Sequence, residues 1–172
     1  MCFNLIFDLH YRNSSLPPPD GSRLNGIQPW YLATLAVAEQ LYDALLTWGT
    51  LRAIDVTPTS QAFFAQFVPT IAPGTYRADT DSDPDLDPKE SISGTYSRLS
   101  AAIRAYADGF LAIVARHTPS GGGLAEQSDK ASGTPASAAD LSWSYAAVLT
   151  AFRARKGGSG GAWGAKNLEV VW

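Results

Sequence analysis

One segment of the chain predicts a helix that is apolar on nearly every side. Residues 30–48 read WYLATLAVAEQLYDALLTW, preceded by Pro29, whose missing N–H costs no hydrogen bond in a first turn, and followed by Gly49. The strongly polar residues in its middle are Glu39, Gln40 and Asp43. Such a helix must be buried on most sides, which one short neighbour cannot achieve. The segment therefore predicts a helical protein in which several helices surround this one.

Three further helices are predicted from periodicity and capping signals. The first covers 58–68, between a Thr57 cap and Pro69. The second covers 97–117 and is amphipathic, with an apolar stripe of Leu99, Ile103, Tyr106, Phe110 and Ile113. The third covers 137–156, since Ser137 and Asp140 have capping-box spacing and basic residues lie near its end. Apart from the terminal NLEVVW, no alternating run is long enough for a sheet, so the predicted class is all-α.

Composition and charge exclude several classes of protein. The 172 residues are 45% hydrophobic and 17% charged, as in an ordinary globular domain. A formal net charge of -3 gives no attraction to phosphate backbones or anionic lipids, so we expect no nucleic acid and no membrane as partners. No segment approaches the ~18 uninterrupted apolar residues of a spanning helix. The charge balance suits a neutral substrate.

The same residues predict no metal and no cofactor. Cys2 is the only cysteine, and His10 and His117 lie far apart, so an intrachain disulfide and a zinc site are excluded. Residues 79–90 carry acidic side chains at the spacing of a calcium loop, but Pro84 occupies the position that requires a glycine. We therefore expect an acidic surface loop there, without calcium.

Three stretches carry a resemblance to a known family. They are Asn25-Gly26 followed by PWYLATLAVAEQLYDAL, then YADGFLAIV with LAEQSDKASG, then DLSWSYAAVLTA. In content, order and spacing they resemble the catalytic domain of fungal glucoamylases, glycoside hydrolase family 15. The resemblance implies that residues 25–165 form the C-terminal segment of that domain, flanked by tails 1–24 and 166–172. The implied fold is a partial (α/α)6 barrel, about one third of the full domain, with segment 30–48 in the inner ring.

The resemblance also implies an activity and site residues. The family removes terminal α-1,4-linked glucose from starch and maltooligosaccharides with inversion, using a general acid and a second carboxylate that activates water. The base of the family motif corresponds to Glu126, in a loop after three glycines. Trp30 and Trp143 correspond to aromatic residues that bind substrate or shape the site. Without the resemblance, a lone loop glutamate would be idle and both indoles would be packing residues.

The chain also departs from the family pattern. The residues that correspond to the general acid, and to the arginine and aspartate that hold the terminal glucose, are absent. Ser128 stands where relatives carry an aromatic side chain. The family is secreted, yet MCFNLIF lacks the basic start of a signal peptide. We therefore expect a truncated product that has little activity by itself and that associates through an exposed apolar flank.

Two other interpretations remain open. The chain can be a noncatalytic remnant that acts as a glucan-binding or helical interaction module. It can also belong to a related helical barrel that cleaves other α-linked glucosides.

Overall fold

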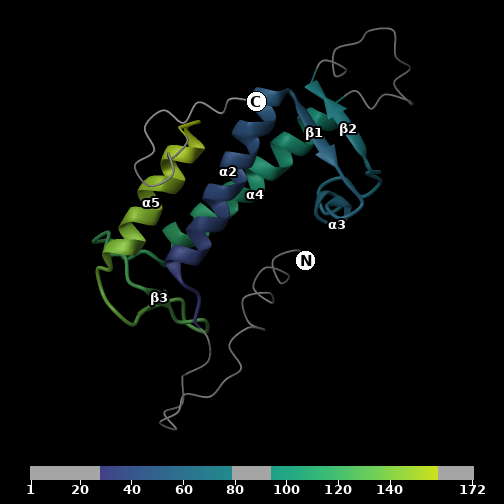
Figure 1. Cartoon of the computed structure of the whole chain (residues 1–172). Coiled ribbons are helices and arrows are strands. Elements are labelled where there is room, and N and C mark those ends of the chain that lie inside the picture. Colours follow the sequence, from purple (N-terminus) through teal and green to yellow (C-terminus); the bar gives the residue numbers. More distant parts are fainter. Residues whose placement is uncertain (1–27, 79–93, 159–172) are drawn as a thin grey trace.

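The computed structural model of the chain describes residues 28–78 and 94–158. Helices α2 (Tyr31–Leu51), α4 (Thr95–His117) and α5 (Ser142–Arg155) form its body, with one short helix, α3 (Gln61–Phe64). Strands β1 (Ala53–Val56) and β2 (Gly74–Arg77) form one antiparallel pair, and β3 (Gln127–Ser128) and β4 (Pro135–Ala136) form another. Helix α2 packs against both α4 and α5, with β1–β2 near its C-terminal end and β3–β4 near its N-terminal end (Figure 1). The fold is therefore helix-rich, as predicted.

Helix α2 confirms the predicted apolar helix, but only one stripe of it is fully buried by the described residues. The stripe consists of Tyr31, Leu35, Ala38 and Tyr42, at the spacing of one helix face. Most of the other apolar side chains of α2 are half-buried. The helix also continues past the expected end at residue 48, because one glycine weakens a helix without ending it. Its end is the left-handed Arg52, whose N–H donates to the carbonyl of Trp48.

Helix α4 confirms the predicted amphipathic helix with a small shift of its buried face. The buried residues are Leu99, Ile103, Ala107, Phe110 and Val114. Tyr106 and Ile113, which were expected on the stripe, are half-buried at its edges. The helix begins two residues earlier than expected, after Gly94 with a φ of 88°.

The region after α2 corrects two expectations. The helix predicted over 58–68 is reduced to α3, followed by separate turns that bury Val68 and Ile71. Strand β1 was not predicted, because its alternation of Ile54 and Val56 with exposed residues covers only four positions. It pairs with β2, and the pair packs with Phe64, Leu99 and Ile103 in one cluster. The stability of so short a pair comes from this cluster.

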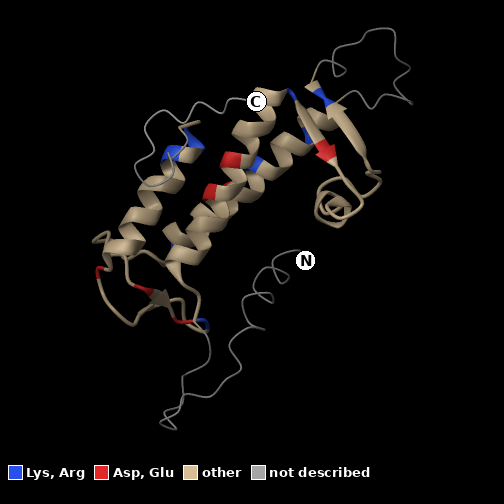
Figure 2. Cartoon of the chain, viewed as in Figure 1, with Lys and Arg blue, Asp and Glu red and all other residues tan. Residues whose placement is uncertain are grey.

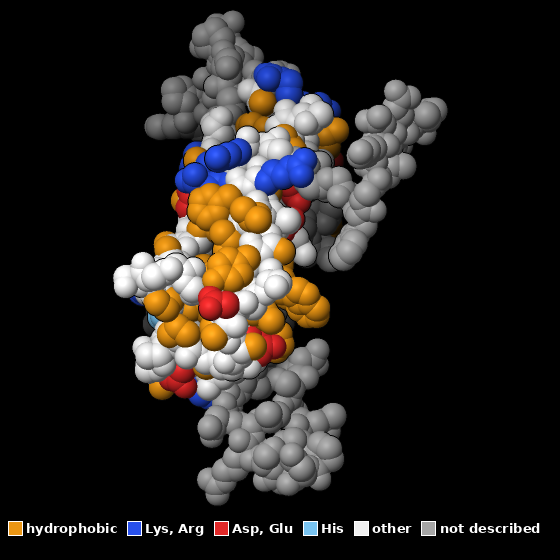
Figure 3. Space-filling view, turned by 90° about the vertical axis from the view of Figure 1, so that its left-hand side faces the viewer, with side chains coloured by type: hydrophobic (Ala, Val, Ile, Leu, Met, Phe, Trp, Pro, Cys, Tyr) orange, Lys and Arg blue, Asp and Glu red, His pale blue; other side chains and the backbone are white. Residues whose placement is uncertain are grey.

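The start of α5 also differs from the prediction. Ser137 and Asp140 have φ values of 65° and 53°, so neither belongs to a helix and the capping box does not form. The helix begins at Ser142, and its buried stripe consists of small residues: Ser144, Ala147, Ala151 and Ala154. Its larger apolar side chains, Trp143, Leu149 and Phe152, are exposed. Figure 3 shows hydrophobic side chains on the side of the molecule where α5 lies.

A polar cluster joins the three long helices. The Tyr42 hydroxyl donates to Asp108 Oδ1 at 2.6 Å, and Arg155 Nε donates to the same oxygen at 2.7 Å. The bond from Arg155 holds the pKa of Asp108 below its usual value, and burial raises the pKa of Tyr42 to about 12. Figure 2 marks the positions of basic residues at the end of α5 and of acidic residues along α2. Within the described ranges, no helix is long and apolar enough to cross a membrane.

Candidate functional site

Glu126 lies directly before β3, at the end of the molecule where α2 and α5 begin. Its N–H donates to the carbonyl of Ala138 at 2.8 Å, and its carbonyl accepts from the N–H of Tyr31 at 3.2 Å. Because both the N–H and the carbonyl of Glu126 are hydrogen-bonded, its Cα atom is held between α2 and the segment that follows β4. The sequence predicted only a loop here, without these partners.

Glu126 is half-buried as a residue, and its carboxylate oxygen Oε2 accepts a hydrogen bond from the Ser137 hydroxyl at the surface. Ser137 was expected to cap a helix, and its left-handed backbone instead brings its hydroxyl to the carboxylate. Oxygen Oε1 has no bonding partner among the described residues. One oxygen of the carboxylate is therefore held by Ser137, whereas the other has no partner in the described part of the chain. Sequence reasoning missed Ser137, because only the pairing of β3 with β4 reveals it.

The two residues before Glu126 are held by the first turn of α5. The Ser144 hydroxyl, which is fully buried, donates to the carbonyl of Ala125 at 2.8 Å. The N–H of Leu124 donates to the Tyr145 hydroxyl at 3.1 Å, and that hydroxyl donates to Asp140 at 2.7 Å. The bond to Asp140 raises the pKa of Tyr145. The start of α5 is therefore a rigid support for the segment that carries the carboxylate.

Trp30 and Trp143 lie on segments that contact the neighbours of Glu126. Trp30 precedes α2 and forms an antiparallel bridge with Gln127, and its side chain is half-buried. Trp143 lies next to Ser144 in α5 and is 65% exposed. The structure thus places all three predicted site residues at one end of the helices. The contact of both indoles with a sugar stays a prediction.

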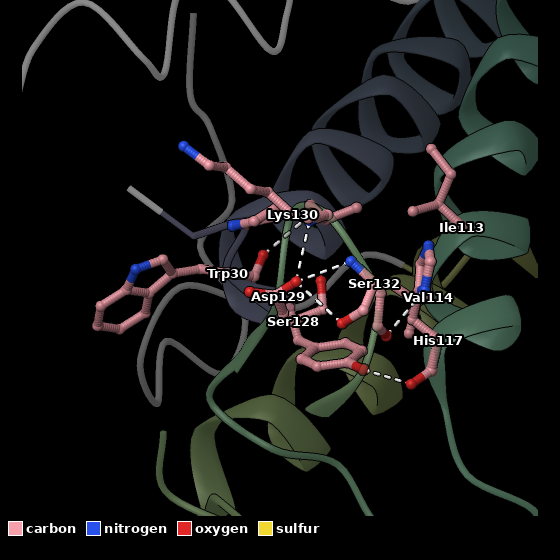
Figure 4. Close-up of a pocket in the computed structure, with 13 residues that line it drawn as sticks. Trp30, Ile113, Val114, His117, Ser128, Asp129, Lys130 and Ser132 are labelled. Carbon is pink, nitrogen blue, oxygen red and sulfur yellow. Dashed lines mark hydrogen bonds between the residues drawn. The ribbon is translucent and has the colours of Figure 1, made fainter. Parts of the chain in front are cut away.

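A cavity of about 190 Å³ lies between the start of α2, the end of α4 and the turn after β3. Its lining includes Trp30, His117, Asp129, Lys130 and Ser132 (Figure 4). The N–H and hydroxyl of Ser132 bond to the Asp129 carboxylate and hold its pKa below the usual value. The lining does not include Glu126 or Trp143, so this cavity is separate from the predicted carboxylate.

In the described part of the chain, no group of three or more His, Cys, Asp or Glu side chains is placed to hold a metal ion. The acidic segment 79–90, where we expect no calcium, lies outside the described residues.

Comparisons with known proteins agree on one family. The family model of the glycosyl hydrolases family 15 matches residues 7–153. Glucoamylase-1 of Schizophyllum commune is 54% identical over 142 residues, which cover 83% of this chain and 22% of the relative. A glucoamylase of Neurospora crassa is 50% identical over 143 residues, or 83% of this chain and 21% of the relative.

Solved structures give the same result. The family 15 glucoamylase from Hypocrea jecorina matches 79% of this chain and 20% of its own, with a TM-score of 0.69 and 46% identity. The glucoamylase of Hormoconis resinae matches 88% of this chain and 25% of its own, with a TM-score of 0.68 and 33% identity. The chain therefore spans about a fifth of the length of these relatives. By sequence and by fold, the chain belongs to the glycosyl hydrolases of family 15.

Proposed function

We propose that residues 25–165 are the C-terminal segment of a glucoamylase catalytic domain, flanked by tails 1–24 and 166–172. In this proposal α2 is an inner helix of an (α/α)6 barrel, of which the segment makes up about one third. The support is the surface of α2, which is apolar on nearly every side but has only one stripe fully buried by the described residues. The apolar remainder would contact further helices of the same domain.

In this domain Glu126 acts as the general base. An inverting glycosidase uses one carboxylic acid to protonate the leaving oxygen and one carboxylate to deprotonate water on the opposite face of the sugar. The two carboxyl groups stand roughly 6.5–9.5 Å apart to leave room for that water. The observation that carries this role is the Ser137 bond to Oε2, which orients the carboxylate and leaves Oε1 for the water. The acid would come from residues outside this chain.

Trp30 and Trp143 would line the sugar site on either side of Glu126. Both lie at the same end of the helices, and the exposed indole of Trp143 offers an apolar face of the kind that packs on a glucose ring. The substrates in this proposal are starch and maltooligosaccharides, and the enzyme is secreted as its family is. Nucleic acid and membranes play no part, which is consistent with the net charge of -3.

A hybrid enzyme tests this function. The chain replaces the matching 142-residue segment of Glucoamylase-1 from Schizophyllum commune, and glucose release from maltooligosaccharides is measured. We expect activity in the hybrid, and a loss of about 10²–10⁴-fold in kcat with Glu126→Gln, the range for a general base. Asp55→Asn is the matched control, because Asp55 lies on β1 at the opposite end of α2 and should leave kcat unchanged. An active hybrid that tolerates Glu126→Gln would refute the proposed role.

A second candidate function is a noncatalytic helical interaction module. The observation that favours it is the outer face of α5, where Leu149 and Phe152, three residues apart, are exposed while small residues are buried against α2. Large apolar side chains exposed together on one face indicate an interaction surface. This candidate predicts that the chain associates with itself or with another helical protein, whether or not Glu126 is present. Glucose release by the hybrid that depends on Glu126 would decide for the enzyme.

A further inference from the structure

The turn that joins β3 to β4 is bonded within itself and to the chain before α2. Asp129 and Thr134 close it, with the N–H of Asp129 donating to the carbonyl of Thr134 at 2.7 Å. The Asp129 carboxylate accepts from the N–H groups of Ala131 and Ser132 at 3.0 and 2.7 Å. The Gln28 amide group donates to the same carboxylate at 3.3 Å and accepts from the N–H of Lys130 at 2.7 Å.

The last residue of α4 contacts this turn through its ring. The Nδ1 atom of His117 lies 3.0 Å from the carbonyl oxygen of Gly133 (Figure 4). Because a carbonyl oxygen only accepts, Nδ1 must carry the hydrogen of this bond. The carbonyl of His117 in turn accepts from the Tyr31 hydroxyl at 2.6 Å. The ring is therefore attached to a helix end that is itself bonded to α2.

Only glycine fits at position 133 beside the His117 ring. Its φ is 72°, and a Cβ atom built on it would lie 2.3 Å from His117 Nδ1 and 2.4 Å from Cε1. Any side chain there would both strain the backbone and collide with the imidazole. The ring thus rests directly on the backbone of the turn.

The register of this hairpin determines which side chain reaches Glu126. Gln127 pairs with Ala136 and Ser128 with Pro135, and beyond these pairs the Glu126 N–H donates to the carbonyl of Ala138, which leaves Ser137 opposite the Glu126 side chain. A slip of one residue would move the Ser137 hydroxyl away from the carboxylate. Two paired residues are too few to hold a register by themselves. The register is therefore held by contacts from outside the hairpin: Trp30 bridges Gln127, the Ser128 N–H donates to Pro29, and the His117 ring holds the turn at Gly133.

We propose that His117 is a positioning residue for the general base. Its ring holds the Gly133 turn, the turn sets the register of β3 with β4, and the register places the Ser137 hydroxyl on Glu126. His117 acts through Gly133 and does not touch the substrate. The structural part of this inference stands on the contacts above, whereas its effect on catalysis rests on the proposed function.

Amide hydrogen exchange on the full chain tests the structural part. His117→Ala should speed exchange by about tenfold at the amides of Glu126 and Ser128, which donate to Ala138 and Pro29, as expected when one supporting hydrogen bond is lost. The amides of Ile103 and Ala107 in the middle of α4 should not change. His117→Asn places an amide nitrogen near the position of Nδ1 and should restore most of the protection.

A double substitution keeps the test decisive where a single variant unfolds. Gly133→Ala should disturb the hairpin far more in the presence of His117 than together with His117→Ala, because the second change removes the collision. Equal effects in both backgrounds would overturn the proposal. So would an exchange rate at Glu126 and Ser128 that is unchanged, or that rises equally throughout α4, in His117→Ala.

The hybrid enzyme tests the catalytic part. His117→Ala should lower kcat by about tenfold to a hundredfold with little change in KM, the effect of a misplaced catalytic group, and His117→Asn should recover most of it. A loss confined to KM, or equal losses in the alanine and asparagine variants, would contradict a positioning role. If the unmodified hybrid has no activity, the proposed function fails, and the exchange measurements still decide whether His117 holds the segment that carries Glu126.

Discussion

Removal of the Tyr42 hydroxyl should destabilise the chain more than removal of the Arg155 guanidinium, which donates to the same Asp108 oxygen. Tyr42 is 2% exposed, and its hydroxyl donates at 2.6 Å to an Asp108 carboxylate that also accepts from Arg155. Tyr42→Phe keeps the ring, so no large cavity forms and the loss is that of a hydrogen bond to a charged acceptor, about 1.5–3 kcal/mol. Because the Asp108 side chain is 38% exposed and water can replace the hydroxyl, we expect the lower end of that range.

Arg155→Met provides the comparison. The Arg155 side chain is 44% exposed, and exposed ion pairs contribute little because solvent screens them and both side chains lose entropy. Methionine keeps most of the apolar stem, so this variant should lose clearly less stability than Tyr42→Phe. Urea denaturation followed by far-UV circular dichroism gives the free energy of unfolding of both variants and of the double variant. A larger loss in Arg155→Met than in Tyr42→Phe would refute this reasoning.

Three further measurements test Asp108, the buried Asp43 and the outer face of α5. The pKa of Asp108 is lower in the folded chain than its usual 3.8, so its carboxylate adds to the free energy of unfolding above pH 3.8 and this addition is lost as the pH falls through the folded-state pKa. The urea midpoint should therefore fall in acid, and it should fall less in Asp108→Asn. Burial, and to a smaller extent the charge of Glu39, raises the pKa of Asp43, whose buried Oδ1 has no partner within residues 28–78 and 94–158. Asp43→Asn should therefore raise the urea midpoint at pH 7, and a lower midpoint would count against this explanation. Sedimentation velocity should show self-association of the chain that Leu149→Gln with Phe152→Gln weakens; a monomer at all concentrations would contradict an exposed interaction face.

The long helices could be predicted because their periodicity extends over several turns. Helix α4 repeats its apolar stripe five times, and the apolar length of α2 leaves no alternative to a helix. The pair β1–β2 could not be predicted, because each strand has four residues and their pairing depends on contacts with Phe64 and α4. The predicted start of α5 was wrong. Ser137 and Asp140 match a capping box in sequence, but both have left-handed backbone conformations after the β3–β4 hairpin.

The residues of the candidate site could be proposed from the sequence, but the contacts that hold them could not. Glu126, Trp30 and Trp143 were found through family motifs, and the structure places them at one end of the helices. Ser137 and His117 could not be assigned, because their contacts with Glu126 and Gly133 depend on a strand register that no local pattern encodes. The family motifs thus predict which groups form the site, whereas tertiary contacts determine how these groups are held.

Chemical rescue of a Glu126→Gly hybrid enzyme tests the central claim most directly. With α-glucosyl fluoride as substrate, fluoride leaves without a general acid, and added azide can take the place of the activated water. If Glu126 is the general base, the variant should be nearly inactive alone, and azide should restore turnover by attacking C1 from the opposite face to give β-glucosyl azide. Proton NMR distinguishes this product from the α anomer. Full activity without azide, or an α-configured product, would contradict the account.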